Sequence, residues 1–278
     1  GGRGSWKKVR RTSESATRRA QGRIRAMNTP TALLDRLDAI GRSLAHHDDA
    51  LALIGLGSVG VERERLDAYS DLDFYLVVRP GAKQRFFNNI DWLEAAASVV
   101  FRYRGPGDGL HILFADGIYA EMAIFTVAEL GSAGYAPGRM VWKRPWVDEA
   151  LATPARTPPA PATPPPDQLL GEVLCNLHVG LLRFRRGERL AAAREIQLYA
   201  VDRMLELAVH LEPEQASAHD PFARMRRFER RFPKMAEQLS AFQQGYERTP
   251  ESAAAMLDYL AARFPLNEAM VAAIRELL

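Results

Sequence analysis

Two aspartates at the start of an apolar segment are the residues of this sequence that most clearly suggest chemistry. Asp71 and Asp73 are separated by Leu72 and lead into the apolar residues 74–78. Residues at positions i and i+2 of a strand point to the same side. The two carboxylates would therefore lie side by side and repel each other unless a cation lies between them. Mg²⁺ prefers oxygen ligands and is the natural partner for such a pair.

A turn of small residues lies upstream of these aspartates. Gly57 and Ser58 follow the apolar segment 50–56, which we expect to be a buried strand. The turn would bring backbone N–H groups and one hydroxyl close to whatever the metal holds, and phosphate oxygens readily accept such hydrogen bonds. A phosphate-binding turn next to metal-binding carboxylates is typical of phosphoryl or nucleotidyl transfer.

A third carboxylate often completes such a site, either as a metal ligand or as the general base. Glu121 is the best candidate, because it lies within an otherwise apolar segment, where burying an unpaired acid is costly. We expect it in the second strand of a hairpin that turns at Asp116 and Gly117, both with positive φ. An isolated Asp-x-Asp motif more often lies on a solvated turn, so the prediction depends on the motifs occurring together.

The combined motif resembles the signature of the DNA polymerase β-like nucleotidyltransferase superfamily. That signature is a hydrophobic residue, Gly, and Gly or Ser, followed after a gap by Asp, a hydrophobic residue, and Asp or Glu. The matching residues here are Leu56, Gly57 and Ser58, and then Asp71, Leu72 and Asp73. The stretch "DAYSDLDF" is also similar to the bacterial antibiotic nucleotidyltransferases. The third acid of the family, on a later strand, corresponds to Glu121.

The resemblance implies transfer of a nucleoside monophosphate, AMP from ATP or the equivalent from another nucleoside triphosphate, to a hydroxyl of a small molecule, with release of pyrophosphate. It implies two Mg²⁺ ions held by Asp71, Asp73 and Glu121. It also implies that Gly57 and Ser58 hold the triphosphate. The plan of a catalytic sheet followed by helices is similar to that of aminoglycoside and lincosamide nucleotidyltransferases. An antibiotic is therefore an expected acceptor and antibiotic resistance an expected role.

The loop before the aspartates departs from the family pattern. It reads Glu-Arg-Glu-Arg at positions 62–65, where many relatives have a simpler Arg-Gly-type turn. We interpret Arg63 and Arg65 as solvated loop charges. A contact of either side chain with phosphate is the alternative.

Metal ligands other than carboxylates are scarce. The single cysteine, Cys175, excludes an intrachain disulfide, argues against a Cys-based metal site and fits a reducing, cytoplasmic setting. The six histidines show no metal-ligand spacing. His46 and His47 are adjacent, so we expect them to point in different directions at the surface.

The length and charge of the chain limit the class of protein. Its 278 residues allow one large domain or two ordinary ones. No apolar run approaches the roughly 20 residues that a membrane span needs. Residues 1–26 carry +8, which leaves −5 for the remainder of a chain whose total is +3. We interpret this tail as disordered and as an upstream or non-native extension, with a nucleic-acid arm as the alternative.

The hydrophobic patterns predict an α+β protein. A small mixed sheet with helices is expected over residues 27–150, a Pro-rich connector over 151–166, and an all-α helical bundle over 167–278. In the first part, the expected elements are helices from residue 30 and over 83–98, strands over 50–56 and 72–79, the hairpin, and an edge strand over 138–147.

The helical part is expected to complete the nucleotide site. Asp167 would cap its first helix, and a second helix would span 188–211. The relatives use this helix pair to bind nucleotide, so the resemblance implies contacts from Arg186 and Arg194. Solvated arginines on amphipathic helices are the alternative. The other functions that we consider are AMP transfer to a protein or RNA and a nucleotide-binding regulatory protein, and we also consider a homodimer.

Overall fold

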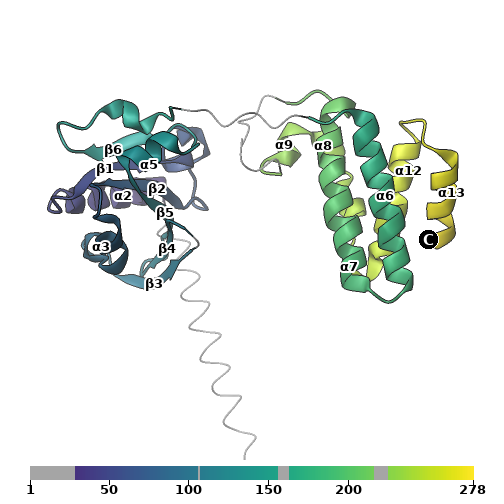
Figure 1. The fold of residues 1–278 in the computed structure, drawn as a ribbon, viewed down its shortest axis with the longest axis horizontal. Coiled ribbons are helices and arrows are strands. Elements are labelled where there is room, and N and C mark those ends of the chain that lie inside the picture. Colours follow the sequence, from purple (N-terminus) through teal and green to yellow (C-terminus); the bar gives the residue numbers. More distant parts are fainter. Residues whose placement is uncertain (1–28, 106, 156–162, 216–224) are drawn as a thin grey trace, which may run out of the picture. The chain divides into compact units, whose positions relative to one another are not determined.

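The computed structural model describes residues 29–105, 107–155, 163–215 and 225–278 (Figure 1). The predicted tail over residues 1–26 lies outside the described residues, as does part of the predicted connector, residues 156–162. The chain divides into two compact units, Gly1–Pro158 and Pro159–Leu278.

A six-stranded mixed sheet forms the first unit, and its strand order is β3-β4-β5-β2-β1-β6. The β2–β5 pair is parallel, and every other pair is antiparallel. The predicted α+β class is confirmed, and the predicted last strand forms one edge of the sheet. The strands are β1 (Ala50–Gly55), β2 (Leu72–Val78), β3 (Val99–Arg104), β4 (Gly109–Phe114), β5 (Tyr119–Thr126) and β6 (Arg139–Lys143).

Both faces of the sheet carry apolar side chains, but the two faces are covered differently. One face packs against α2 (Pro30–Leu44), α3 (Lys83–Asn88) and α4 (Asp91–Glu94), and this side holds the larger core, including the fully buried Trp92. The other face carries a smaller cluster under α5 (Val127–Ser132).

Helix α2 begins as predicted. The side chain of Thr29 accepts a hydrogen bond from the N–H of Ala32 at 3.1 Å, and Pro30 occupies the first turn. Leu33, Leu37 and Ile40 then recur at helical spacing, and all three are fully buried. Burial of each such side chain contributes about 1.5–3 kcal/mol, so the helix is held mainly by its contact with the sheet.

The predicted β4–β5 hairpin is present, but its turn differs from the prediction. Gly117 takes a φ of 90°, whereas Asp116 is not among the described residues with positive φ. The N–H of Gly117 donates to the carbonyl of Phe114 at 2.9 Å. The carboxylate of Asp116 instead pairs with Arg36 of α2 at 2.5 Å. The aspartate therefore joins the hairpin to the helix layer rather than taking a left-handed conformation.

The single helix predicted over 83–98 is wrong. The structure has two short helices there, α3 and α4, followed by the unpredicted strand β3. Asn89 lies between the helices with a φ of −111° and a ψ of 117°, and its side-chain oxygen accepts from the N–H of Asp91 at 3.1 Å. A short polar side chain that bonds the backbone ahead of it competes with helix continuation, which explains the break.

The described part of the second unit contains helices and no strand. Its first helix begins at Pro166, so Asp167 lies in the first turn and is not the cap that we predicted. The predicted second helix contains a π-helical segment in its middle. The main elements are α6 (Pro166–Arg185), α7 (Arg189–Arg194), the π-helical η4 (Glu195–Ala200), α8 (Val201–Leu211), α9 (Phe228–Arg231), α10 (Pro233–Ala236), α11 (Leu239–Phe242), α12 (Thr249–Ala261) and α13 (Glu268–Leu277). Within the described ranges, no helix has the length and apolar character of a membrane span.

Two glycines on α6 should respond to alanine in opposite ways. A Cβ on Gly180 would lie 2.5 Å from Cγ1 of Ile196, whereas nothing lies within 4 Å of a Cβ on Gly171. We expect Gly180→Ala to cost about 1–3 kcal/mol of unfolding free energy through overpacking. We expect Gly171→Ala to add up to about 1 kcal/mol through helix propensity.

Urea unfolding followed by far-UV circular dichroism would measure both changes. No tryptophan lies after residue 146, so tryptophan fluorescence reports on the first unit and should be the same in both variants. Changes of the same sign in the two variants would contradict the packing described for α6.

Candidate functional site

The parallel pairing of β2 with β5 brings two predicted site acids together. Asp73 is the register partner of Glu121, and this pair is flanked along the strands by the pairs Leu72–Ala120 and Phe74–Met122. These flanking residues are all buried on the face that carries the larger core. Because side chains alternate along a strand, both carboxylates leave the opposite face, on strands about 4.8 Å apart.

The charge of the third predicted acid, Asp71, reaches the same end of the sheet. Tyr119 lies two residues before Glu121 and therefore on the same face of β5. Its pKa is raised first by burial and then by the negative charges of Glu121, Asp71 and Asp73. The field of all three predicted acids thus reaches one hydroxyl at this end of the sheet.

The arrangement fits a metal only in part. Among the residues that the structure describes, no group of three or more His, Cys, Asp or Glu side chains could hold a metal ion. Mg²⁺ is usually bound by one or two carboxylates, with water and substrate phosphates as its other ligands. Asp73 and Glu121 are oxygen donors in register and fit that pattern as a pair. The ligand set of Asp71, Asp73 and Glu121 stays a prediction.

The Gly-Ser turn lies directly beside Asp73. The N–H of Leu56 donates to the carbonyl of Asp73 at 2.8 Å, so the β1–β2 pairing continues up to the turn. Gly57 has a φ of 51°, and a Cβ there would lie 3.6 Å from Oδ2 of Asp73. Ser58 is half-buried, and within the described residues its hydroxyl makes no hydrogen bond. The turn therefore leaves one hydroxyl available next to a carboxylate.

Arg65 is not a solvated loop charge, which corrects our interpretation. Its side chain is only 20% exposed and pairs with Glu62. Its Nη2 lies 3.6 Å from the position of a Cβ on Gly57, a point that is equally far from Oδ2 of Asp73. The guanidinium therefore lies at the turn, near the carboxylate. Arg63 is exposed, as we expected.

Sequence reasoning missed two residues that contact Glu121. His111 on β4 is the register partner of Glu121 on β5. Nδ1 of His111 lies 2.9 Å from the hydroxyl of Tyr119 and 3.4 Å from Oε1 of Glu121. The Tyr119 hydroxyl donates to the same Oε1 at 3.2 Å. Alternation along β5 could have found Tyr119, which shares the face of Glu121. The predicted two-residue turn pairs Glu121 with Ile112, so only the observed register identifies His111.

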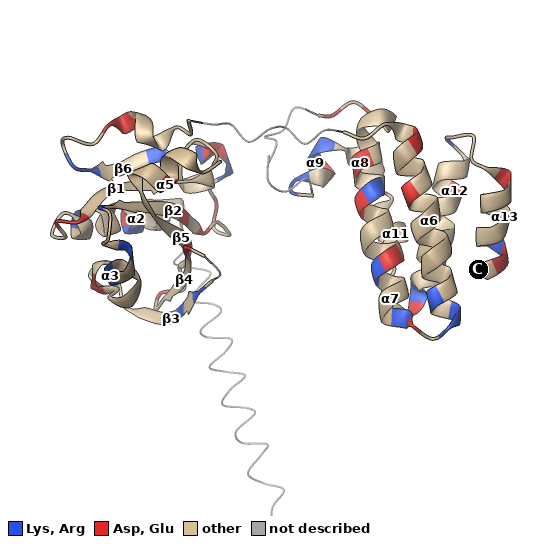
Figure 2. Cartoon of the chain, viewed as in Figure 1, with Lys and Arg blue, Asp and Glu red and all other residues tan. Residues whose placement is uncertain are grey.

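Arg186 and Arg194 lie in the second unit, apart in sequence from the acids and the turn. Both are exposed, at the end of α6 and on α7. Figure 2 shows basic residues gathered around the turn between these two helices. Arg194 donates to the Tyr199 hydroxyl at 3.4 Å and lies over its ring. Their contact with nucleotide stays a prediction.

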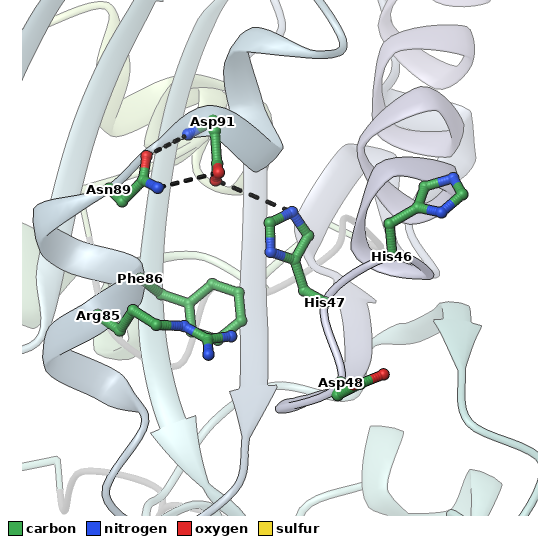
Figure 3. Close-up of a pocket in the computed structure, with 7 residues that line it drawn as sticks. All are labelled: His46, His47, Asp48, Arg85, Phe86, Asn89 and Asp91. Carbon is green, nitrogen blue, oxygen red and sulfur yellow. Dashed lines mark hydrogen bonds and ion pairs between the residues drawn. The ribbon is translucent and has the colours of Figure 1, made fainter.

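A polar cavity of about 300 Å³ lies at the end of β1 opposite the Gly-Ser turn (Figure 3). Nε2 of His47 lies 3.8 Å from Oδ1 of Asp91, while His46 points elsewhere, as predicted for adjacent residues. The Asp91 carboxylate accepts from the side chain of Asn89 at 2.9 Å and from the N–H of Trp92 at 2.8 Å. Asp91 therefore has a structural role in starting α4.

No family model and no curated protein matches the chain. Among solved structures, an aminoglycoside 6-adenyltransferase from Bacillus subtilis is similar at 15% identity. The match covers 90% of this chain and 91% of that one, with a TM-score of 0.32. A TM-score of this size does not establish a shared arrangement, so the function proposed below is argued from the residues of this chain.

The repulsion between Asp73 and Glu121 should be measurable. Like charges opposite each other on neighbouring strands are destabilising, so we expect Glu121→Gln to raise the unfolding free energy by roughly 0.5 kcal/mol without divalent ions. The glutamine keeps an oxygen that can accept from Tyr119. Urea unfolding followed by tryptophan fluorescence would measure the gain, which should shrink in high salt. A loss of stability would contradict this description of the pair.

Proposed function

We propose that this chain is a nucleotidyltransferase that transfers a nucleoside monophosphate to a hydroxyl group and releases pyrophosphate. The observation that carries the proposal is the register pairing of Asp73 with Glu121 beside the turn of Gly57 and Ser58. This pairing puts a carboxylate that can take a proton next to a turn that can bind phosphate, which is what the reaction requires.

Each residue has a role in this proposal. Ser58 donates its hydroxyl to the β- or γ-phosphate, and the charge of Arg65 favours the same group. Glu121 accepts the proton of the attacking hydroxyl. Asp71 and Asp73 would hold Mg²⁺, which when bound offsets charge on the leaving pyrophosphate and lowers the pKa of the acceptor hydroxyl. A role for Glu121 as a metal ligand is the alternative to its role as base.

The proposed substrates are ATP and a small hydroxylated acceptor of the aminoglycoside or lincosamide type. The support for both is the resemblance of the sequence motif to that of the antibiotic nucleotidyltransferases, together with the register pairing of Asp73 and Glu121. An acceptor screen with ATP and Mg²⁺, read out as pyrophosphate release, tests the proposal. Protein and RNA acceptors form separate arms of the same screen.

The decisive variant is Asp73→Asn. Losing this charge beside the triphosphate should lower kcat at least about 100-fold, as expected when a group that stabilises transition-state charge is lost. Asp35→Asn is the matched control, because Asp35 is exposed on α2, on the opposite face of the sheet. Pyrophosphate release that persists in Asp73→Asn would refute the site assignment. No release by the unmodified chain with any acceptor would refute the proposed activity.

The role of the helical unit in nucleotide binding is tested by Arg194→Met. If Arg194 contacts the triphosphate, the KM for ATP should rise roughly tenfold, as expected for a lost hydrogen bond to a charged group. Arg263→Met is a matched control, since Arg263 likewise lies over a tyrosine ring, that of Tyr259 at 3.6 Å. Equal effects of the two substitutions would refute a specific role for Arg194, and Arg186→Met can be tested in the same way.

A further inference from the structure

We propose that His111 and Tyr119 are positioning residues that fix the carboxylate of Glu121 for proton transfer. The inference rests on the proposed function, because it assigns Glu121 the role of base in that reaction. It adds two residues that the sequence motif does not contain. It also assigns different tasks to the two oxygens of one carboxylate.

The hydrogen bonds run in one direction. Tyr119 has a single hydroxyl proton, and this proton is donated to Oε1 of Glu121. The hydroxyl oxygen must then accept from Nδ1 of His111, which lies 2.9 Å away. Neutral His111 therefore carries its proton on Nδ1, because the hydrogen bond made by a ring nitrogen determines the tautomer.

Every contact that holds the carboxylate falls on one oxygen. Tyr119 and His111 both approach Oε1 of Glu121, at 3.2 and 3.4 Å. In the part of the chain that the structure describes, Oε2 makes no hydrogen bond. The carboxylate is thus held at one oxygen, and the other is left to take a proton from the acceptor.

Glu121 needs such an anchor because its side chain is 48% exposed. An exposed glutamate samples several rotamers, whereas proton transfer requires the base to be held within hydrogen-bonding reach of the acceptor. The anchor is itself constrained. The His111 ring lies between Tyr103 and Tyr119, with ring centroids 5.6 and 6.3 Å away.

Gly105 leaves room for this ring. A Cβ at that position would lie 3.2 Å from Nε2 of His111, which is tighter than an ordinary contact. The imidazole therefore has a tyrosine on each side along the sheet and Gly105 at its Nε2 edge. A ring that is held in this way can fix Tyr119, and through it Glu121.

The kinetic test compares two hydroxyl deletions. Tyr119→Phe removes the donor to Glu121, and Tyr246→Phe removes an exposed tyrosine hydroxyl from the second unit. We expect Tyr119→Phe and His111→Phe to lower kcat about 10- to 100-fold, the size of loss that misplacement of a catalytic group produces. The KM for ATP should change little, and Tyr246→Phe should leave kcat unchanged. His111→Asn should recover part of kcat, since its amide can donate from nearly the position of Nδ1.

A second readout does not require activity. Long-range ¹H–¹⁵N NMR of the full chain, without nucleotide and at about pH 8, reports the tautomer of neutral His111. We expect the Nδ1–H form, shifting towards Nε2–H in Tyr119→Phe, with the signal assigned by its loss in His111→Asn.

The two readouts separate the proposals. An Nε2–H tautomer in the unmodified chain overturns the inference whatever the kinetics show. Unchanged kcat in both Tyr119→Phe and His111→Phe overturns it as well, while leaving the proposed activity intact. A chain that is inactive with every acceptor refutes the proposed function, and the tautomer still tests whether the hydrogen-bond chain exists.

Discussion

The register of the parallel pair β2–β5 determines the candidate site. β2 and β5 are far apart in sequence, and their pairing alone brings Asp73 next to Glu121. A slip of one residue would move every side chain of a strand to the other face of the sheet. The site therefore exists only as long as this register is kept.

The core keeps the register against the repulsion of the two acids. Opposed like charges on neighbouring strands cost about 0.2–1 kcal/mol. The same strands bury Leu72, Phe74 and Leu76 of β2 and Ile124 of β5 completely, and each such side chain contributes about 1.5–3 kcal/mol. A slip that separated the acids would expose these residues, so the chain cannot relieve the repulsion in that way.

Much of this arrangement could be predicted, because the motif residues are close in sequence or lie on strongly patterned strands. The β1 and β2 strands, the Gly-Ser turn beside Asp73, and Glu121 on the second strand of a hairpin all follow from composition and alternation. The broken helix at Asn89 and the following strand β3 could not, because a local side-chain hydrogen bond and an edge pairing override a helix-like pattern. His111 could not be predicted either, because the predicted two-residue turn pairs Glu121 with Ile112, whereas the observed register pairs it with His111.

The same register extends the site across four strands. Tyr103, His111, Glu121 and Asp73 are successive register partners from β3 to β2. The aspartate end of this row lies beside the Gly-Ser turn, and the tyrosine end lies on the exposed edge strand. Tyr75 and Phe125 lie on the same face, two and four residues beyond Asp73 and Glu121 on β2 and β5, and pack against the smaller apolar cluster under α5. The open part of the face is thus the part that carries polar groups, so an acceptor could reach Glu121 without disturbing the core.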